Sequence, residues 1–233
     1  MDKNPQNIKS MFSEIASSYD RANDTLSLGI HHLWKKKLIK MSGAQPGQHV
    51  LDCATGTGDL ALLFKEKVGR VGSVIGTDFC QEMLEEAPIK AHKKGLDVRF
   101  QLADAMALPF EDNQFDISSI SFGIRNVEKP LVALSDMARV TKSGGVVMVL
   151  EFGQVSTPGL KQVYDIYSSK ILPFVGGMIS GKPSAYQYLN DSSQEFPCAE
   201  NFQQKILSTG KFQAVEFKTL SLGVAYIYRC QVK

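Results

Sequence analysis

Apolar residues recur along this chain with two different spacings, and the spacing changes near residue 46. In the first segment, Ile8, Met11, Phe12, Ile15 and Tyr19 fall on one side of a 3.6-residue period, which predicts an amphipathic helix. A second helix is predicted over "HHLWKKKLIKM". Because residues 1–46 contain no strand pattern, we expect a helical lid there.

After "QPGQ" short apolar runs alternate with helical patterns. The predicted strands are "HVLDCA", "GSVIGTDF", "DVRFQLAD", "FDISSISF" and "VVMVLEF". The helices between them are "GDLALLFKEKV", "QEMLEEAPIKAHKK" and "PLVALSDMARVT", and "SGG" is predicted as a turn. This alternation is typical of an open parallel sheet with helices on both faces, and the mostly apolar fifth strand suits its centre.

Residues 155–200 interrupt this order. Leu160, Val163, Tyr164, Tyr167 and Ile171 form a helical stripe, and "LPFVGGMISGKPSAYQYLNDSSQEFP" follows it. The chain then has a helix at "ENFQQKILSTG" and an antiparallel hairpin formed by "FQAVEFKTL" and "VAYIYRCQV". We expect the lid and this insertion to lie together over the carboxyl ends of the strands, where open sheets bind ligands.

The predicted fold is therefore α/β and doubly wound, with a mostly parallel seven-stranded sheet, an antiparallel last strand and an N-terminal helical lid. We interpret residues 1–233 as one domain. Its segments are the lid (1–46), a cofactor-binding sheet (47–153), an acceptor-side insertion (154–205) and a closing hairpin (206–233).

Composition narrows the functional classes. Of the 233 residues, 43% are hydrophobic and 21% charged, as in an ordinary globular protein, and a net charge of +2 gives no argument for nucleic acid. The cysteines are scattered and no His/Cys/Asp cluster has ligand spacing, so no metal site is predicted. The first ten residues are polar and no apolar run approaches the ~20 residues of a membrane span, which favours a cytoplasmic protein. Lys35, Lys36 and Lys37 are read as a solvated helix face or as a contact with anionic lipid.

The first strand leads into a glycine-rich turn. In "LDCATGTGDLA", Gly56, Gly58 and Ala61 fit G-x-G-x-x-A, which predicts a nucleotide-binding turn at the start of a helix. Two cofactors are compatible with this motif, a nicotinamide dinucleotide and S-adenosylmethionine.

Three carboxylates follow three consecutive strands and favour the second cofactor. Asp52 would repel a diphosphate but attract an ammonium group, Asp78 could bind ribose hydroxyls, and Asp104 could meet an adenine amino group. The structural alternatives are a buried salt bridge for Asp52, an Asx-turn for Asp104 and a helix N-cap for Asp59.

With these residues the chain resembles the class I S-adenosylmethionine-dependent methyltransferases, which have a Rossmann-like fold. The resemblance implies that Gly56, Thr57 and Gly58 line the cofactor. It also implies that Asp78 holds the ribose, that Asp104 and Ala105 border the adenine, and that Ser121 lies near the methionine end. Ala54 stands where the wide superfamily has glycine.

Four stretches make the resemblance narrower. "MFSEIASSYDRANDTLSLGIHHLWKK", "LDCATGTGDLA", "FDISSISFGIRNV" and "LPFVGGMISGKPSAYQYLNDSSQEFP" resemble the ubiquinone/menaquinone biosynthesis C-methyltransferase family, which keeps alanine at the position of Ala54. This implies C-methylation of a polyprenylated quinol, either demethylmenaquinol, 2-polyprenyl-6-methoxy-1,4-benzoquinol or both.

"SFGIRNVEKP" puts a guanidinium and an amide at the end of the fourth strand. A phenol titrates near pH 10, about three units above neutrality, so C-methylation needs a stabilised phenolate. We interpret Arg125 and Asn126 as the groups that hold the developing phenolate oxygen. The structural alternative for Arg125 is a salt bridge to Glu128 or Asp116.

The proton would go to water, Tyr19 or His31. His31 could equally be an ordinary helix residue whose ring is satisfied by backbone or solvent, and Tyr19 could equally be a core residue of the lid.

A polyprenyl tail needs an apolar groove, and the insertion supplies candidates that could also be ordinary core: Tyr164, Tyr167, Ile171, Leu172, Phe174, Val175, Met178 and Ile179. The same apolar segment leaves open a peripheral membrane contact. The alternative functions are methylation of another small aromatic or lipid acceptor, a nicotinamide-dependent oxidoreductase, and a catalytically silent binding module or scaffold. Oligomeric state is left open.

Overall fold

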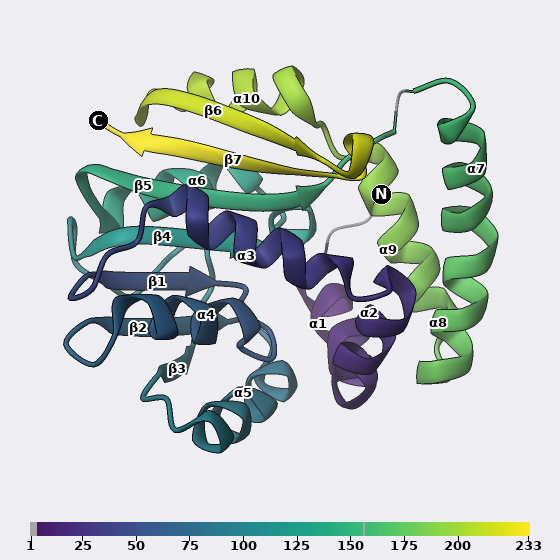
Figure 1. Cartoon of the computed structure of the whole chain (residues 1–233), viewed down its shortest axis with the longest axis horizontal. Helices are drawn as coiled ribbons and strands as arrows, with labels where there is room; N and C mark the ends of the chain where they lie inside the picture. Colours follow the sequence, from purple (N-terminus) through teal and green to yellow (C-terminus); the bar gives the residue numbers. More distant parts are fainter. Residues whose placement is uncertain (1–3, 156) are drawn as a thin grey trace.

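The computed structural model describes residues 4–155 and 157–233, without the side chain of Leu160. Figure 1 shows a twisted sheet with helices on both faces and a helical layer at one end. The sheet has seven strands in the order β3-β2-β1-β4-β5-β7-β6. They are β1 (His49–Cys53), β2 (Ser73–Asp78), β3 (Arg99–Leu102), β4 (Phe115–Ser121), β5 (Thr141–Phe152), β6 (Phe212–Leu220) and β7 (Ala225–Val232).

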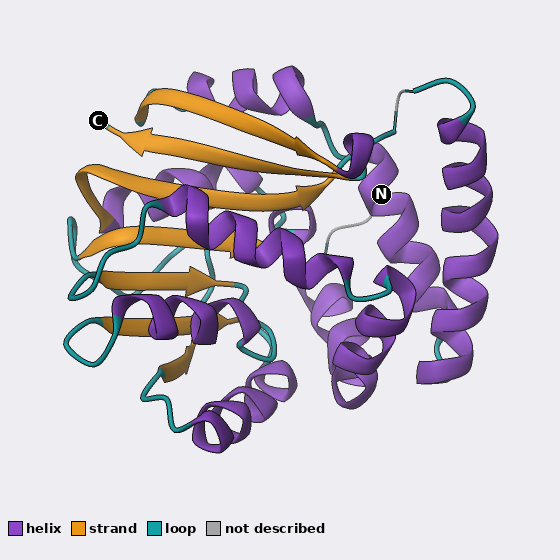
Figure 2. Cartoon of the chain, in the orientation of Figure 1, coloured by secondary structure: helices purple, strands orange, loops and turns teal. Residues whose placement is uncertain are grey.

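The first five strands are mutually parallel, and β7 inserts antiparallel between β5 and β6. The α/β fold predicted from the alternating pattern is therefore confirmed, including the antiparallel last strand (Figure 2). Because the chain order reverses between β1 and β4, the carboxyl ends of these two strands form the crevice where open sheets bind ligands.

Two hydrophobic layers hold helices against the sheet. One lies under α3 (Ile30–Ser42) and α4 (Asp59–Val68), with Trp34 and Phe64 among its buried members. The other lies under α6 (Pro130–Val140) and α10 (Ala199–Ser208), with Met137 and Phe202 buried. The helix α5 (Gln81–Lys94) packs along β2 and β3 at the edge of the sheet.

The remaining helices gather beyond the carboxyl ends of the parallel strands (Figure 1). They are α1 (Pro5–Ile15), the 3-10 turn η1 (Ala16–Ser18), α2 (Tyr19–Ser27), α7 (Leu160–Ile166), the π-helical turn η3 (Tyr167–Ile171), α8 (Leu172–Ser180) and α9 (Pro183–Glu195). Lid and insertion touch directly, because Lys182 pairs with Glu14 at 2.8 Å and Arg21 donates to the Ile179 carbonyl at 3.3 Å. The expected contact between the two segments is confirmed.

Two local predictions need correction. The helix predicted to run through Thr141 ends at Val140, and "SGG" lies inside β5 instead of forming a separate turn. The strand is irregular at these glycines, since Gly144 has a φ of +74° and the pairing register shifts between Phe115 and Ile117. The neighbouring strand β4 supplies pairing partners that a local pattern does not contain.

Within the described residues, no helix combines the length and the apolar character that a membrane crossing would need.

Candidate active site

Two adjoining cavities open at the carboxyl ends of β1, β2 and β4. The larger has a volume of about 550 Å³ and the smaller about 90 Å³. The two cavities share part of their lining, namely Tyr19, Ala54, Gly56, Ser121 and Phe122. The smaller cavity lies under the lid, because Pro5 and Phe12 of α1 are among its lining residues.

The glycine-rich turn forms the floor between the cavities. Ala54, Gly56 and Gly58 have φ values of +48°, +57° and +86°, so the turn passes three times through the left-handed region. At Gly58 a side chain would also come within 2.9 Å of Ala87. The methyl group of Ala54 packs against Gly123. A Cβ atom at position 123 would lie 2.5 Å from the Cβ of Ala54, so the glycine leaves the space that Ala54 needs.

Asp78 braces this turn from the end of β2. Its Oδ2 accepts the backbone N–H of Gly56 at 2.8 Å and its Oδ1 that of Cys80 at 3.0 Å. Burial raises the pKa of Asp78, and the backbone donors oppose that rise. The carboxylate lines the smaller cavity.

Asp104 and Ala105 line the same smaller cavity, after β3. The Oδ1 of Asp104 accepts the N–H of Met106 at 2.8 Å, which is the Asx-turn considered as its structural alternative. That role and a ligand contact are compatible, because Asp104 is exposed and its second oxygen has no hydrogen-bond partner among the described residues.

Asp52 is almost completely buried beneath the larger cavity. Its two oxygens accept hydrogen bonds from Ser119 at 2.6 Å and Thr55 at 2.7 Å. Burial raises the pKa of Asp52 to about 6, against the effect of these two hydroxyls. No cationic side chain of the described chain forms a salt bridge with it, so the charge is available to a cationic ligand.

Thr57 belongs to a network that ties the lid to the turn. We call Asp20, Lys35, Thr57, Asp59 and Lys90 the latch. Thr57 donates to Asp20 at 2.7 Å, Lys90 binds Asp20 at 2.8 Å and also Asp59, and Lys35 binds Asp59 at 2.9 Å. Burial opposes ionisation of Asp59, but Lys35 and Lys90 together hold its pKa well below the usual range.

The latch changes two readings made from the sequence. Gly58 is the N-cap of α4 and Asp59 is its first residue, so the carboxylate binds lysines instead of capping. Lys35 is largely buried against Asp59, whereas Lys36 and Lys37 are exposed. The solvated basic face is therefore smaller than the three lysines suggest.

Arg125 is buried on the 3-10 turn η2 (Ile124–Asn126), and its ion-pair partner is Glu151 at the end of β5. Nη1 lies 2.6 Å from Glu151 Oε1 and also donates to the Phe122 carbonyl at 2.7 Å, while Nε donates to Ser192 at 3.3 Å. The partners suggested by sequence, Glu128 and Asp116, are not used.

The third guanidinium nitrogen of Arg125, Nη2, is not used in these contacts. Nη2 has no hydrogen-bond partner among the described residues, and Arg125 lines the larger cavity. The only sequence signal for Glu151 was a single charge in the apolar run "VVMVLEF".

The side chain of Asn126 points to the smaller cavity, unlike that of Arg125. It lines the smaller cavity, where its Oδ1 is buried without a partner among residues 4–155 and 157–233, and its amide nitrogen makes a long contact of 3.5 Å with the Phe122 carbonyl. Arg125 and Asn126 therefore face different cavities. Ser121 Oγ, which is also buried and has no partner within the ranges that the structure describes, lines both cavities.

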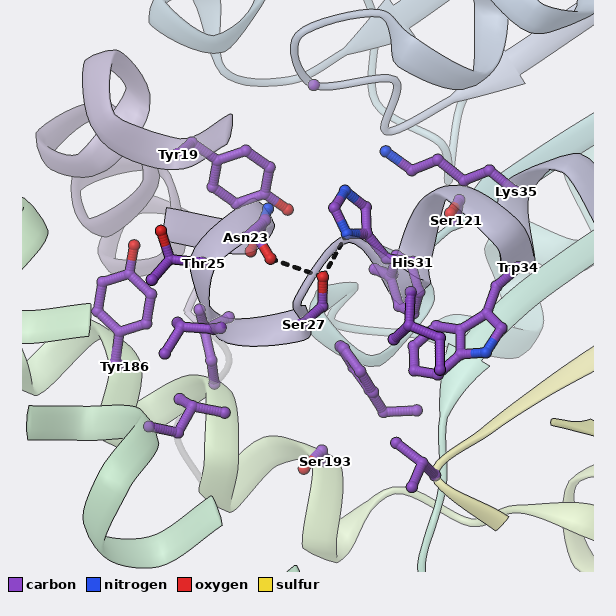
Figure 3. Close-up of a pocket in the computed structure, with 18 of the residues that line it drawn as sticks. Tyr19, Asn23, Thr25, Ser27, His31, Trp34, Lys35, Ser121, Tyr186 and Ser193 are labelled. Carbon is purple, nitrogen blue, oxygen red and sulfur yellow. Dashed lines mark hydrogen bonds between the residues drawn. The ribbon is translucent and has the colours of Figure 1, made fainter. Parts of the chain in front are cut away.

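Tyr19 and His31 both line the larger cavity from the lid (Figure 3). Burial raises the pKa of Tyr19, so this phenol stays protonated and can donate. Burial, together with Lys35 and His32, lowers the pKa of His31 to about 4, so its ring is neutral at pH 7.

The tautomer of His31 follows from its neighbours. Ser27 Oγ donates its single proton to the Asn23 carbonyl at 2.7 Å, so its 2.5 Å contact with His31 Nδ1 requires the ring to donate (Figure 3). The lone pair is therefore on Nε2.

The insertion forms the other side of the larger cavity. Five of the residues expected in an apolar groove do line it: Tyr164, Tyr167, Ile171, Leu172 and Val175. Phe174 and Met178 instead point outwards, 66% and 64% exposed, and Ile179 packs against the lid. Tyr186 Oη and Asn190 Oδ1 on α9 are buried at the cavity without hydrogen-bond partners in the described part of the chain, and no sequence pattern indicated them.

Comparison with known proteins is in agreement with this geometry. The sequence profile of the ubiE/COQ5 methyltransferase family matches residues 1–232. A protein of Bdellovibrio bacteriovorus named ubiquinone/menaquinone biosynthesis C-methyltransferase UbiE is 55% identical over 230 residues, covering 99% of this chain and 97% of the relative. A protein of the same name from a Ruegeria species is 41% identical, covering 95% of this chain and 88% of the relative.

Solved structures show the same fold at low sequence identity. A SAM-dependent methyltransferase of Thermotoga maritima, described as a possible histamine N-methyltransferase, superposes with a TM-score of 0.68 at 19% identity, covering 97% of this chain and 100% of that one. Phosphoethanolamine N-methyltransferase 2 of Haemonchus contortus, solved in complex with S-adenosyl-L-methionine, gives 0.60 at 18% identity, covering 86% and 52%.

Proposed function

Because this chain belongs to the ubiE/COQ5 methyltransferase family, we propose that it transfers a methyl group from S-adenosylmethionine to a ring carbon of a polyprenylated quinol. The acceptor class is demethylmenaquinol, 2-polyprenyl-6-methoxy-1,4-benzoquinol or both, in agreement with the names of its relatives. The observation that carries the proposal is the apolar cavity of about 550 Å³ beside the glycine-rich turn, with the free Nη2 of Arg125 on its wall.

The residues around the turn fit S-adenosylmethionine. Asp78 would hold the ribose, Asp104 and Ala105 would border the adenine, and the unpaired Oδ1 of Asn126 would accept a donor there. Gly56, Thr57 and Gly58 would form the cradle, and Ser121 would meet the methionine end.

Asp52 suits this cofactor and disfavours a nicotinamide dinucleotide. A buried carboxylate near the pyrophosphate position of a dinucleotide would repel it, whereas the ammonium and sulfonium groups of S-adenosylmethionine would stabilise the ionised form. S-adenosylmethionine supplies a methyl group that is already activated, so the protein's task is to make the acceptor carbon electron-rich and to remove its proton.

Arg125 is the residue placed for the first of these tasks. Its Nη2 would donate to the quinol oxygen next to the reacting carbon and stabilise the phenolate that forms there. The Glu151 pair and the Phe122 carbonyl hold the guanidinium in position, so little reorganisation is needed during transfer. Asn126 would act on the cofactor side, and not on the same oxygen as first expected.

Proton removal falls to His31 in this proposal. Its Nε2 lone pair is available, but a pKa of about 4 makes it too weak a base for a phenol that titrates near pH 10, so the phenol proton would leave to water. A weak base is sufficient for the ring proton on the newly methylated carbon, because losing it restores aromaticity. Tyr19, protonated, would donate a hydrogen bond to the acceptor.

The insertion would receive the polyprenyl tail. Leu172 and Val175 of α8 and Tyr164 of α7 supply apolar surface inside the cavity. Phe174 and Met178, on the exposed face of α8, would allow a cytoplasmic enzyme to rest on a membrane and take up its lipid-soluble substrate.

The direct test is incubation of the protein with S-adenosylmethionine carrying a labelled methyl group and a short-chain demethylquinol, under reducing conditions. We expect label on a ring carbon of the quinol and one S-adenosylhomocysteine per methyl group. Label on an oxygen, or hydride transfer from a nicotinamide with no methyl transfer, would refute the proposal. Running benzoquinol and naphthoquinol acceptors in parallel identifies the preferred ring.

A further inference from the structure

Three potential metal ligands converge where α2 meets α3. Asp24 lies in the last turn of α2, and His31 and His32 lie in the first turn of α3. Their ligand atoms are all within 4.8 Å of one another. The linking residues Leu28 and Gly29 have φ values of 49° and 74°, and this tight left-handed connection brings the two helix ends together.

The separations suit a small tetrahedral ion. Asp24 Oδ1 is 3.6 Å from His31 Nε2 and accepts a hydrogen bond from His32 Nε2 at 2.7 Å, so a bound ion would take the place of the His32 proton. With Zn²⁺–ligand bonds of about 2.0–2.1 Å, tetrahedral ligands are about 3.4 Å apart. The two observed distances lie on either side of that value, so small side-chain rotations would complete the geometry.

A neighbouring hydroxyl already prepares one ligand. Because Ser27 donates to the Asn23 carbonyl, the His31 ring donates from Nδ1 to Ser27 Oγ and keeps the lone pair of Nε2 free. Metal-binding histidines characteristically donate their other ring N–H to an oxygen in this way, which fixes the tautomer and the ring orientation.

The cluster is accessible and borders the larger cavity. The side chains of Asp24 and His32 are 55% and 47% exposed, whereas that of His31 is 9% exposed and lines the cavity. An ion can therefore enter from solvent and bind beside the acceptor. Three protein ligands leave a fourth position for water.

We propose that Asp24, His31 and His32 bind a divalent transition metal ion, with Zn²⁺ the best fit, and that this ion inhibits the enzyme. Two imidazoles and a carboxylate suit Zn²⁺ and not Mg²⁺, which prefers oxygen ligands. Inhibition follows because the ion occupies the Nε2 lone pair that His31 would use to accept a proton. This consequence rests on the proposed function, whereas binding itself does not.

Binding is tested with the full chain by Zn²⁺ competition against a chromogenic chelator. We expect one Zn²⁺ per chain, at least about 10-fold weaker binding in His32→Asn and Asp24→Asn, and about 10- to 100-fold weaker binding in Ser27→Ala, which removes the oxygen that orients His31. His92→Asn, an exposed histidine in the last turn of α5, is the matched control and should bind as the parent does. Equal Zn²⁺ affinity in the parent, His32→Asn and Asp24→Asn would overturn the site.

Inhibition is tested separately, with each protein compared with its own metal-free rate. Zn²⁺ should slow methyl transfer by the parent and by His92→Asn near the measured dissociation constant, and chelation should restore it. His32→Asn should need at least about 10-fold more Zn²⁺. Binding without inhibition would overturn the inhibitory role. Absence of methyl transfer in metal-free parent would count against the proposed function, while the chelator titration would still decide the site.

Discussion

At the scale of single residues, Arg125 combines a structural contact with a free donor. Its pair with Glu151 is buried on both sides, 3% and 1% exposed, so removing the arginine leaves an uncompensated carboxylate. Loss of one partner of such a pair costs about 3–5 kcal/mol. Substitution by alanine alone would therefore mix a folding defect with a catalytic one.

Arg125→Lys separates the two roles. The ammonium can keep the charge next to Glu151 but lacks the second arm that Nη2 provides. We expect methyl transfer at saturating cofactor to fall by on the order of 100-fold, while S-adenosylmethionine affinity stays close to that of the parent. Raising the pH should partly rescue Arg125→Ala, because solvent then supplies more phenolate.

Single-turnover measurements across pH test this prediction, with Arg139→Lys, whose ion pairs with Asp112 and Asp136 lie outside both cavities, as the control. A parental rate in Arg125→Lys would show that the free nitrogen has no part in the chemistry. If the lower rate of methyl transfer is explained entirely by weaker S-adenosylmethionine binding, Arg125 acts in cofactor binding and not on the acceptor.

Asp52 makes a prediction about pH. Burial raises its pKa to about 6 in the unliganded protein, so the ionised form is unfavourable there and is lost as the pH falls through 6. A cationic ligand prefers that ionised form and lowers the pKa on binding. S-adenosylmethionine affinity should therefore be full above pH 6 and weaken by up to about tenfold per pH unit below it.

Calorimetric titration of the parent and of Asp52→Asn between pH 7.5 and 5 checks this dependence. Asp52→Asn should bind S-adenosylmethionine more weakly at pH 7.5, and its affinity should change much less with pH than that of the parent. Some slope will remain, because burial also raises the pKa of Asp78. Identical profiles in the two proteins would exclude Asp52 as the titrating group.

At the scale of elements, the π-helical turn η3 joins α7 to α8, and the segment has two faces. Val163, Ile166, Phe174 and Met178 form the outer stripe, which is exposed. Tyr164, Tyr167, Ile171, Leu172 and Val175 line the larger cavity from the same three elements.

The latch predicts that the lid controls cofactor access. Lys90 of α5 joins Asp20 of α2 to Asp59 of α4, and α1 covers the smaller cavity. Lys90→Met should loosen the lid, because two carboxylates then face each other without the bridging cation. We expect faster hydrogen exchange in α1 and α2 and faster dissociation of S-adenosylmethionine.

Lys94→Met is the matched control for the latch, since Lys94 is one turn further along α5 and forms a surface pair with Glu66. Exposed pairs of this kind contribute about 0–1 kcal/mol, so lid exchange should not change. Equal protection of α1 and α2 in both variants would mean that the lid is held by its apolar contacts alone.

At the scale of the whole molecule, the outer stripe and the basic residues predict weak membrane attachment. Phe174 and Met178 are exposed beside the larger cavity, and Lys36 and Lys37 remain in solvent on α3. Each exposed lysine near an anionic surface contributes about 1 kcal/mol, and burial of each large apolar side chain contributes about 1.5–3 kcal/mol.

We expect sedimentation with anionic vesicles at low salt, with a smaller bound fraction as salt increases. The double variant Phe174→Glu and Met178→Glu should reduce vesicle affinity by at least about tenfold. Val71→Glu is the control. Val71 is exposed and precedes the amino end of β2, whereas the cavities lie at the carboxyl ends of the strands. Equal sedimentation of all three proteins would exclude this face as the membrane contact.

The sequence by itself determined the elements and much of the cofactor turn. The helix of residues 81–94 and the strand of residues 212–220 have the bounds that their patterns predict. Asp52 and Asp78 lie at the ends of adjacent strands as expected. These features were predictable because hydrophobic period, turn glycines and strand ends are properties of about ten consecutive residues.

Only the tertiary structure decided which distant groups meet. Arg125 pairs with Glu151 because β4 and β5 are neighbours, and it faces a different cavity from Asn126 because the turn η2 directs consecutive side chains to opposite sides. The latch and the cluster of Asp24 with His31 and His32 depend on how the lid helices pack. The energy of a charge pair depends on distance and burial, and neither is encoded in local periodicity.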